Sequence, residues 1–263
     1  MQIGVQMNAF SKNVPLDKQI GLMLDNGFET TFCMSDAENA QEIITTGQKA
    51  GLRFETLHGP LGDINNMWKD DPSGEWTFGK ILSAVKLCAG NGIPVLVVHL
   101  SVGRPAPIIN DVGNFRYDAL MEQARKHGVK IAFENSRCLG NIAAALERYE
   151  DACFCWDVGH EHCFTPGLPF LPYFADRVAA LHLHDNLCEL DGDLHRIPFD
   201  GKIDYERVAK ELAASAYRSS IMLELSGGDA IYADYTPEQF YCRAAEAARK
   251  FAAMVEKYRN GIV

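Results

Sequence analysis

The sequence predicts an α/β fold in which a single (β/α)8 TIM barrel spans residues 1–263. Eight short β-rich runs alternate with segments of helical apolar spacing from one end of the chain to the other. Such alternation indicates parallel strands joined by right-handed crossovers. Eight units in 263 residues fit the size of this barrel, and no Pro- or Ser-rich linker divides the chain, so we expect one domain.

Each strand is predicted from a short run rich in β-branched and aromatic residues. The expected strands are Ile3–Asn8, Phe28–Cys33, Leu52–His58, Pro94–His99, Val129–Glu134, Ala152–Asp157, Val178–His184 and Ser220–Leu225. Apolar spacing of three and four residues predicts helices at Asp17–Asn26, Ala37–Ala50, Gly79–Asn91, Phe115–His127, Asn141–Tyr149, Leu168–Ala175, Tyr205–Ala214 and Pro237–Tyr258. Four of the helix ends carry a glycine, which favours termination: Gly27, Gly51, Gly92 and Gly128.

The composition is that of a globular protein with an acidic surface. Basic residues number 25 and acidic residues 35, which gives a formal net charge of −10. This balance disfavours nucleic acid as a partner, because binding to phosphates depends on clustered Lys and Arg. The N-terminal residues contain no basic segment followed by an apolar stretch, and no apolar run is long enough to span a membrane. We therefore expect a cytoplasmic protein without membrane contact.

Polar side chains end one predicted strand after another. They are His58, His99, Glu134, Asp157, His182, His184 and Glu224. Such residues rarely end buried strands without a function. In a barrel of this kind the active site lies at the carboxyl ends of the strands, so these residues are expected to converge.

Four of these residues are expected to form a metal site. Glu134, Asp157 and His182 would supply a mixed oxygen and nitrogen ligand set, and Glu224 would complete it. Such ligands suit Zn²⁺, Mn²⁺ or Mg²⁺. Single residues also have structural interpretations: Glu134 could pair with Arg137, and Asp157 could cap a helix. The repetition of the pattern at the same end of separate strands favours the metal site.

The chain resembles the xylose isomerase-like barrels, which include sugar isomerases and epimerases together with endonuclease IV. The resemblance covers essentially the whole chain and depends on the order and spacing of several short motifs. These are Gly27-Phe28-Glu29, His58-Gly59-Pro60, Asp63-Ile64-Asn65, His99, Glu134-Asn135, Asp157-x-x-His160, His182-Leu-His-Asp185, Asp193-x-His195 and Leu223-Glu224.

The resemblance implies a divalent ion held by Glu134, Asp157, His182 and Glu224. In the epimerase branch the two glutamates also act as the acid–base pair. In the endonuclease branch further ligands hold additional zinc ions, so that one to three ions are expected. The matching residues here, which could bind either metal or substrate, are His58, His99, His160, Asp193 and His195.

The sequence therefore predicts a metal-dependent isomerase or epimerase acting on a sugar, a sugar phosphate or an inositol-type compound. A proton next to a carbonyl would be removed and the metal would stabilise the enediolate. Two alternatives stay open: a keto-sugar or keto-inositol dehydratase, and a zinc phosphodiesterase that cleaves abasic DNA. Whether the chain forms a homo-oligomer also stays open.

Two further segments are candidate substrate contacts. The polar loop Asp191–Asp204 contains Arg196, which could contact a hydroxyl or phosphate group of the substrate. Trp68 and Trp76 follow the third predicted strand, where they could cover the site and form a wall for a sugar.

Overall fold

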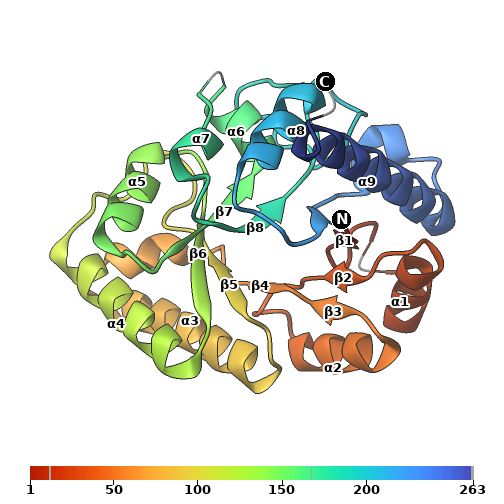
Figure 1. Cartoon of the computed structure of the whole chain (residues 1–263). Coiled ribbons are helices and arrows are strands. Elements are labelled where there is room, and N and C mark those ends of the chain that lie inside the picture. Colours follow the sequence, from red (N-terminus) through yellow and green to blue (C-terminus); the bar gives the residue numbers. More distant parts are fainter. Residues whose placement is uncertain (12, 167, 262–263) are drawn as a thin grey trace.

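The computed structural model describes residues 1–11, 13–166 and 168–261 and confirms the predicted fold class. Strands lie at the centre and helices surround them (Figure 1). Within the described residues the strands are β1 (Ile3–Val5), β2 (Thr30–Thr31), β3 (Arg53–Phe54), β4 (Thr56–His58), β5 (Val95–Val98), β6 (Lys130–Glu134), β7 (Cys153–Asp157), β8 (Val178–His182) and β9 (Ile221–Leu223).

The helices of the described residues follow the strands in order. They are α1 (Leu16–Asp25), α2 (Ala40–Ala50), α3 (Pro72–Gly90), α4 (Asp111–His127), α5 (Leu139–Arg148), α6 (Val158–Phe164), α7 (Leu171–Phe174), α8 (Tyr205–Ala214) and α9 (Pro237–Arg259). Two 3₁₀ helices, η1 (Ile64–Trp68) and η2 (Ala230–Tyr232), lie in loops.

The strands form two parallel sheets that join into one ring. One sheet has the order β3-β2-β1-β9 and the other the order β4-β5-β6-β7-β8. The predicted strand Leu52–His58 is divided at Glu55, so that β3 pairs with β2 and β4 pairs with β5. A parallel bridge between Leu183 and Leu223 links the ends of β8 and β9. The ring is thereby closed on both sides.

Two helices begin well before the predicted residue, and a third helix was not among those expected. Helix α3 begins at Pro72 rather than Gly79, because the Asp71 side chain accepts bonds from the backbone N–H groups of Ser73 and Gly74. Helix α4 begins at Asp111 rather than Phe115, with the Asn110 side chain as its cap. Helix α6 was not among the expected helices, although its first turn is the one for which Asp157 was a candidate cap.

Small apolar side chains fill the barrel interior directly beneath the strand ends. Val97, Ala132, Cys155 and Ala180 belong to one buried cluster, and each lies two residues before a polar strand-end residue. Because side chains two residues apart in a strand point to the same face, His99, Glu134, Asp157 and His182 are directed into the barrel. The larger cluster of buried residues includes side chains of both the strands and the helices.

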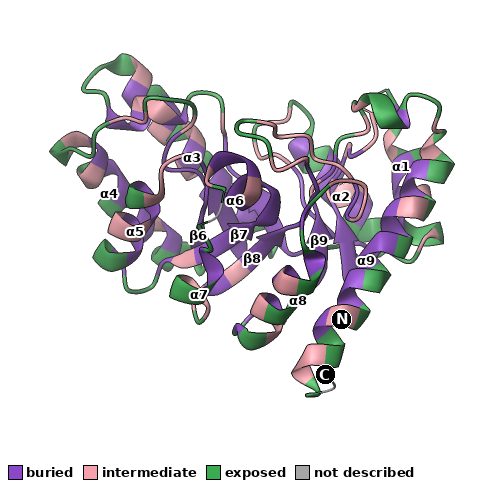
Figure 2. Ribbon diagram, turned by 90° about the horizontal axis from the view of Figure 1, so that it is seen from above, coloured by how far each residue is buried: buried purple, intermediate pink, exposed green. Residues whose placement is uncertain are grey.

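The N-terminus and the loops that follow the strands lie at opposite ends of the barrel. Figure 2 shows the N-terminus and the last turns of α9 at the bottom of the view, and the N-terminus leads directly into β1. The loops that follow the strands lie at the opposite end. Among the described residues, no helix combines the length and the apolar character needed to cross a lipid bilayer.

Trp68 packs in the interface between α3, α4 and η1. Its indole N–H donates to the carbonyl of Leu100 at 2.8 Å, and its ring packs against Tyr117. Gly113 provides the space for this ring, because a Cβ atom at that position would overlap Cε3 of Trp68. The expectation that Trp68 forms a wall for the substrate is therefore wrong.

We expect Gly113→Ala to lower the free energy of unfolding by about 1 to 3 kcal/mol, because the added methyl group overpacks a closed interface. Gly79→Ala in α3 is the matched control, since a Cβ atom there meets no atom within 4 Å. That change should stabilise the helix by about 0.5 to 1 kcal/mol. Urea unfolding of both variants measures the difference, and equal stabilities would contradict the packing argument.

Candidate metal centre

The strand ends bring together the polar residues that the sequence singled out. His58, Glu134, Asp157 and His182 are the last residues of β4, β6, β7 and β8. His99 follows β5 and Glu224 follows β9 by one residue. The structure therefore places all six around the mouth of the barrel.

Glu134 lies at the centre of this group, with a fully buried side chain. Its Oε2 atom is 3.2 Å from Nε2 of His58 and 2.9 Å from Nε2 of His99. Its Oε1 atom is 3.1 Å from Nδ1 of His182. Arg137 pairs instead with Asp191, so the alternative of a Glu134–Arg137 pair is wrong.

The four predicted ligands form one compact set. One ligand atom from each of Glu134, Asp157, His182 and Glu224 can be chosen so that all four lie within 4.8 Å of one another. Nδ1 of His182 is 3.2 Å from Oε2 of Glu224, in addition to its contact with Glu134. Both glutamates therefore contact the same nitrogen of the His182 imidazole.

The polar atoms of this set fit a cation. Oδ2 of Asp157 and Oε2 of Glu224 are buried, and neither has a hydrogen-bond donor among the described residues. Buried carboxylate oxygens usually have partners, and a divalent ion would supply one. Mixed carboxylate and imidazole ligands suit Zn²⁺ or Mn²⁺, and Mg²⁺ to a lesser degree.

The surrounding histidines keep both glutamates ionised. Burial alone would raise the pKa of Glu134, but the positive charges of His182 and His99 hold it well below its usual value. Burial would also raise the pKa of Glu224, and the charge of His182, whose Nδ1 lies 3.2 Å away, lowers it strongly. Each side chain is therefore a carboxylate at neutral pH and can bind a metal or accept a proton.

A second cluster lies beside the first one, on α6 and on the loop between β8 and α8. It consists of His160, His184, Asp193 and His195, whose chosen ligand atoms also lie within 4.8 Å of one another. Asp193 Oδ2 is 3.4 Å from His160 Nε2, and Asp193 Oδ1 is 3.3 Å from His195 Nε2.

Neighbouring carboxylates raise the pKa values of two histidines in this second cluster. Burial would lower the pKa of His160, but the charge of Asp157 and the hydrogen bond with Asp193 raise it to about 10. His195 follows the same pattern, and its pKa rises to about 9 through its bond with Asp193. Both imidazoles therefore carry a proton near neutral pH unless a metal ion replaces it.

His184 is a member of this cluster that the prediction of site residues did not include. The sequence contained a signal, because His182 and His184 are two residues apart near the end of one strand. Two such side chains share a face of the strand. Its partners Asp193 and His195 belong to a loop whose path could not be predicted.

Asp157 has two roles, and helix α6 explains the second. Its Oδ1 atom accepts the backbone N–H of His160 at 2.6 Å, which caps α6 at its first turn. The cap orients the carboxylate and leaves Oδ2 without a partner among the described residues. The alternatives of helix cap and metal ligand are therefore compatible.

Asp185 fixes the loop that carries Asp193 and His195. Its buried carboxylate accepts backbone N–H groups from Asn186, Phe199, Gly201 and Ile203. Its backbone also pairs with that of Arg196 in both directions, at 2.8 and 2.9 Å. This bridge places His195, the neighbour of Arg196, over the second cluster.

Arg196 is held by a protein partner. Its Nε atom is 2.7 Å from Oδ2 of Asp229, and its Nη2 atom is 3.3 Å from Oδ1 of the same residue. A guanidinium bound by two bonds in this way has one edge occupied. The structure thus gives Arg196 a loop-fixing contact, and a contact with substrate stays a prediction.

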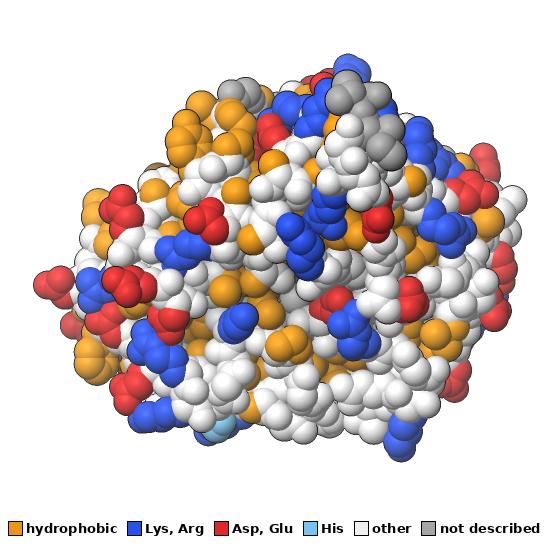
Figure 3. Space-filling model, viewed as in Figure 1, with side chains coloured by type: hydrophobic (Ala, Val, Ile, Leu, Met, Phe, Trp, Pro, Cys, Tyr) orange, Lys and Arg blue, Asp and Glu red, His pale blue; other side chains and the backbone are white. Residues whose placement is uncertain are grey.

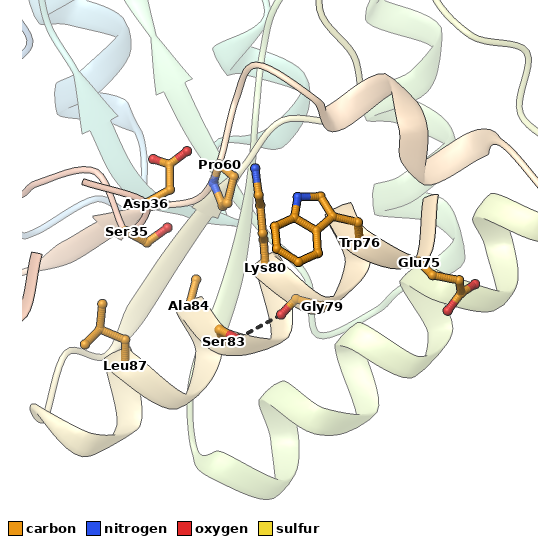
Figure 4. A pocket seen from close by; sticks show the side chains of 10 residues that line it. All are labelled: Ser35, Asp36, Pro60, Glu75, Trp76, Gly79, Lys80, Ser83, Ala84 and Leu87. Carbon is orange, nitrogen blue, oxygen red and sulfur yellow. Dashed lines mark hydrogen bonds between the residues drawn. The ribbon is translucent and has the colours of Figure 1, made fainter. Parts of the chain in front are cut away.

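Trp76 lies outside the strand-end clusters. It is 67% exposed on the flank of α3 and lines a cavity of about 600 Å³. Figure 4 shows Lys80 beside Trp76 on α3, and Ser35, Asp36 and Pro60 across the cavity from them. None of the residues that line it belongs to either cluster, so we place the chemistry at the strand ends rather than in this cavity.

The fold and the site are together those of a TIM barrel that has a candidate metal centre at its strand ends. Residues 18–254 match the family model described as xylose isomerase-like TIM barrel. The chain therefore belongs to the xylose isomerase-like TIM barrel family.

Comparison with known proteins adds one relative and two solved structures. The uncharacterised protein y4fM of Sinorhizobium fredii is 33% identical over 194 residues, or 67% of this chain and 60% of the relative, so the match spans about 60% of the relative's length. D-psicose 3-epimerase of Clostridium cellulolyticum, solved with D-tagatose, has a TM-score of 0.77 at 12% identity and covers 97% of this chain and 99% of its own. The IolI protein with a bound zinc atom has a TM-score of 0.74 at 16% identity, with coverages of 98% and 99%. These structures are similar in fold.

We expect removal of metal with a chelator to lower the melting temperature of the protein, because ligands that bind an ion only in the folded state stabilise that state. The measurement is calorimetry of the purified chain with and without EDTA, followed by addition of Zn²⁺ or Mn²⁺ to restore the transition. A melting temperature that responds to neither treatment would contradict the presence of a metal centre.

Proposed function

We propose that the protein is a metal-dependent isomerase or epimerase that acts on a sugar or a related polyol carbonyl compound. The observation that carries the proposal is the placement of two ionised carboxylates, Glu134 and Glu224, at 3.1 and 3.2 Å from the same atom, Nδ1 of His182. Glu134 comes from β6 and Glu224 from the end of β9, so they reach the site from separate strands.

The chemistry requires a base, an acid and stabilisation of negative charge. A proton is removed from the carbon next to a carbonyl group and is returned to the same or a neighbouring carbon. A divalent ion held by Glu134, Asp157, His182 and Glu224 would act as a Lewis acid toward the oxygens of the substrate. The protein's own groups must then hold and move the proton.

Glu134 and Glu224 are the groups placed to do so. Because their pKa values are held low, each is deprotonated before a substrate binds. A low pKa also makes a weak base, so the C–H next to the carbonyl would have to be made more acidic, which a bound ion would do as a Lewis acid. The carboxyl group that receives the proton becomes the acid for the return step. His58 and His99 lie against Oε2 of Glu134 and can stabilise its charge or donate to a hydroxyl group of the substrate.

We expect Glu224→Gln to abolish turnover, because the amide cannot accept the proton while it keeps the size and one oxygen ligand of the side chain. Glu150→Gln, at an exposed position, is the matched control and should retain full activity. The metal content of both variants is measured beside their turnover. Full activity of Glu224→Gln with its metal retained would contradict the role of Glu224 as a proton acceptor.

A phosphodiesterase is the second candidate, and the additional ligand clusters favour it. His58, Glu134 and His182 form a third group of atoms within 4.8 Å, next to the cluster around Asp193. Hydrolysis at phosphorus uses several ions close together. Against it stands the net charge of −10. On the face shown in Figure 3, basic side chains are interspersed with acidic ones rather than gathered in a patch.

A substrate screen separates the candidates. We expect the metal-loaded protein to interconvert at least one sugar in a panel of ketoses, aldoses, keto-glycosides and inososes, with exchange of a substrate hydrogen for deuterium in ²H₂O. The same preparation is tested for nicking of DNA that contains an abasic site. Nicking without any hydrogen exchange in the panel would favour the phosphodiesterase over the isomerase or epimerase. Loss of water from a keto compound would identify a dehydratase.

A further inference from the structure

Phe32 is a buried aromatic residue that lies outside the apolar core. It is only 2% exposed, yet it belongs to neither cluster of buried apolar residues. A large apolar side chain is usually buried against other apolar groups, which form one contiguous core in a domain. The neighbours of this ring must therefore account for its position in the fold.

The alternation of side chains along the strands directs Phe32 into the barrel. A Cβ atom at Gly4 would meet the side chains of both Thr30 and Met222, so these two side chains lie on one face of the sheet. Met222 is two residues before Glu224 and shares its face, which is the barrel interior. Phe32 is two residues after Thr30 and therefore also points into the interior, at the end of β2.

The ring of Phe32 stacks on the imidazole of His182. The two ring centres are 4.7 Å apart and the ring planes differ by 15°. The imidazole of His58 lies beside both rings, with its centre 6.4 Å from that of Phe32 and 5.8 Å from that of His182. Phe32 is therefore an apolar neighbour of the strand-end residues, two of which contact Glu134.

The partners of its nitrogens hold only one edge of the His182 ring. Nδ1 is 3.1 Å from Oε1 of Glu134 and 3.2 Å from Oε2 of Glu224, whereas Nε2 is buried without a hydrogen-bond partner among the described residues. A histidine that binds a metal usually donates its other ring N–H to a carboxylate or carbonyl, which fixes the ring. The thiol of Cys155 interacts with this imidazole, but a thiol is a weak hydrogen-bonding group. The orientation of the ring must therefore come largely from contacts with its faces.

We propose that Phe32 is a positioning residue of the metal centre, which fixes the plane of the His182 imidazole and so directs Nδ1 at the ion. The two carboxylates select the nitrogen, and the stacked phenyl ring fixes the plane in which that nitrogen lies. An imidazole that binds a divalent ion takes up part of its positive charge, and the face of a phenyl ring attracts positive charge. The inference rests on the proposed function only in taking His182 as a ligand of the metal centre.

The test compares zinc affinities at this site. The Kd of the full chain for Zn²⁺ is measured against a competing chelator, with the ¹⁵N signals of the His182 ring as the readout, so that ions bound elsewhere do not count. We expect Phe32→Leu, which keeps an apolar side chain but removes the aromatic face, to raise this Kd by about 10- to 100-fold.

Phe28→Leu is the matched control. Phe28 precedes β2, is 1% exposed and belongs to the larger apolar cluster, so the same change removes a buried phenyl ring from the core instead. This variant should lose stability but keep the zinc affinity of the wild type. Equal Kd values for Phe32→Leu and Phe28→Leu would overturn the proposal.

The same spectra test the orientation of the ring directly. In the zinc-loaded wild type, Nδ1 of His182 should carry the shift of a metal-bound nitrogen and Nε2 that of a protonated one. In Phe32→Leu the two signals should broaden or exchange roles, a change that loss of stability alone would not produce. Zinc bound through Nε2 in the wild type would overturn the proposal without any variant.

The outcomes separate the role of Phe32 from the proposed function. Zinc bound through Nδ1, with an affinity that Phe32→Leu leaves unchanged, would overturn the positioning role and leave the proposed function standing. The expected loss of affinity, in a protein that exchanges no hydrogen with any sugar of the panel, would leave the positioning role standing and remove the proposed function.

Discussion

The charge on the buried carboxylate of Glu134 is the interaction on which the site depends. An isolated carboxylate cannot stay ionised inside a barrel, because the loss of its hydration costs several kcal/mol. Here His58, His99 and His182 all contact it, from three different strands. The strands must therefore keep their register for the charge to persist, and the small side chains beneath the site set the distance between them.

The second cluster depends on the first through Asp157. This carboxylate caps α6, belongs to the four-residue ligand set and lies 3.1 Å from His184. Its capping bond fixes the first turn of α6, and that turn carries His160. The loop between β8 and α8 reaches the same place because Asp185 accepts four of its backbone N–H groups. Helix, strand and loop are thus held in one arrangement by two buried aspartates.

The sequence was sufficient for the barrel and for the strand-end residues, because both follow from simple periodicities. A residue that ends a parallel strand must lie at the mouth of the barrel, so Glu134, Asp157 and His182 could be placed without coordinates. Apolar spacing alone places the start of α3 at Gly79, whereas the capping signal of Asp71-Pro72 places it at Pro72, where the helix begins. The pairing of Arg196 with Asp229 and the approach of Asp193 and His195 to His184 depend on loop paths that no periodicity encodes.

The exposure of the ligands indicates the side from which a substrate must approach. The side chain of Glu134 is fully covered, whereas that of Glu224 is 14% exposed and those of Asp193 and His195 are 24% and 23% exposed. A substrate that enters beside His195 therefore meets Glu224 before Glu134. Glu134 becomes accessible only when the loop side chains or the carboxylates shift.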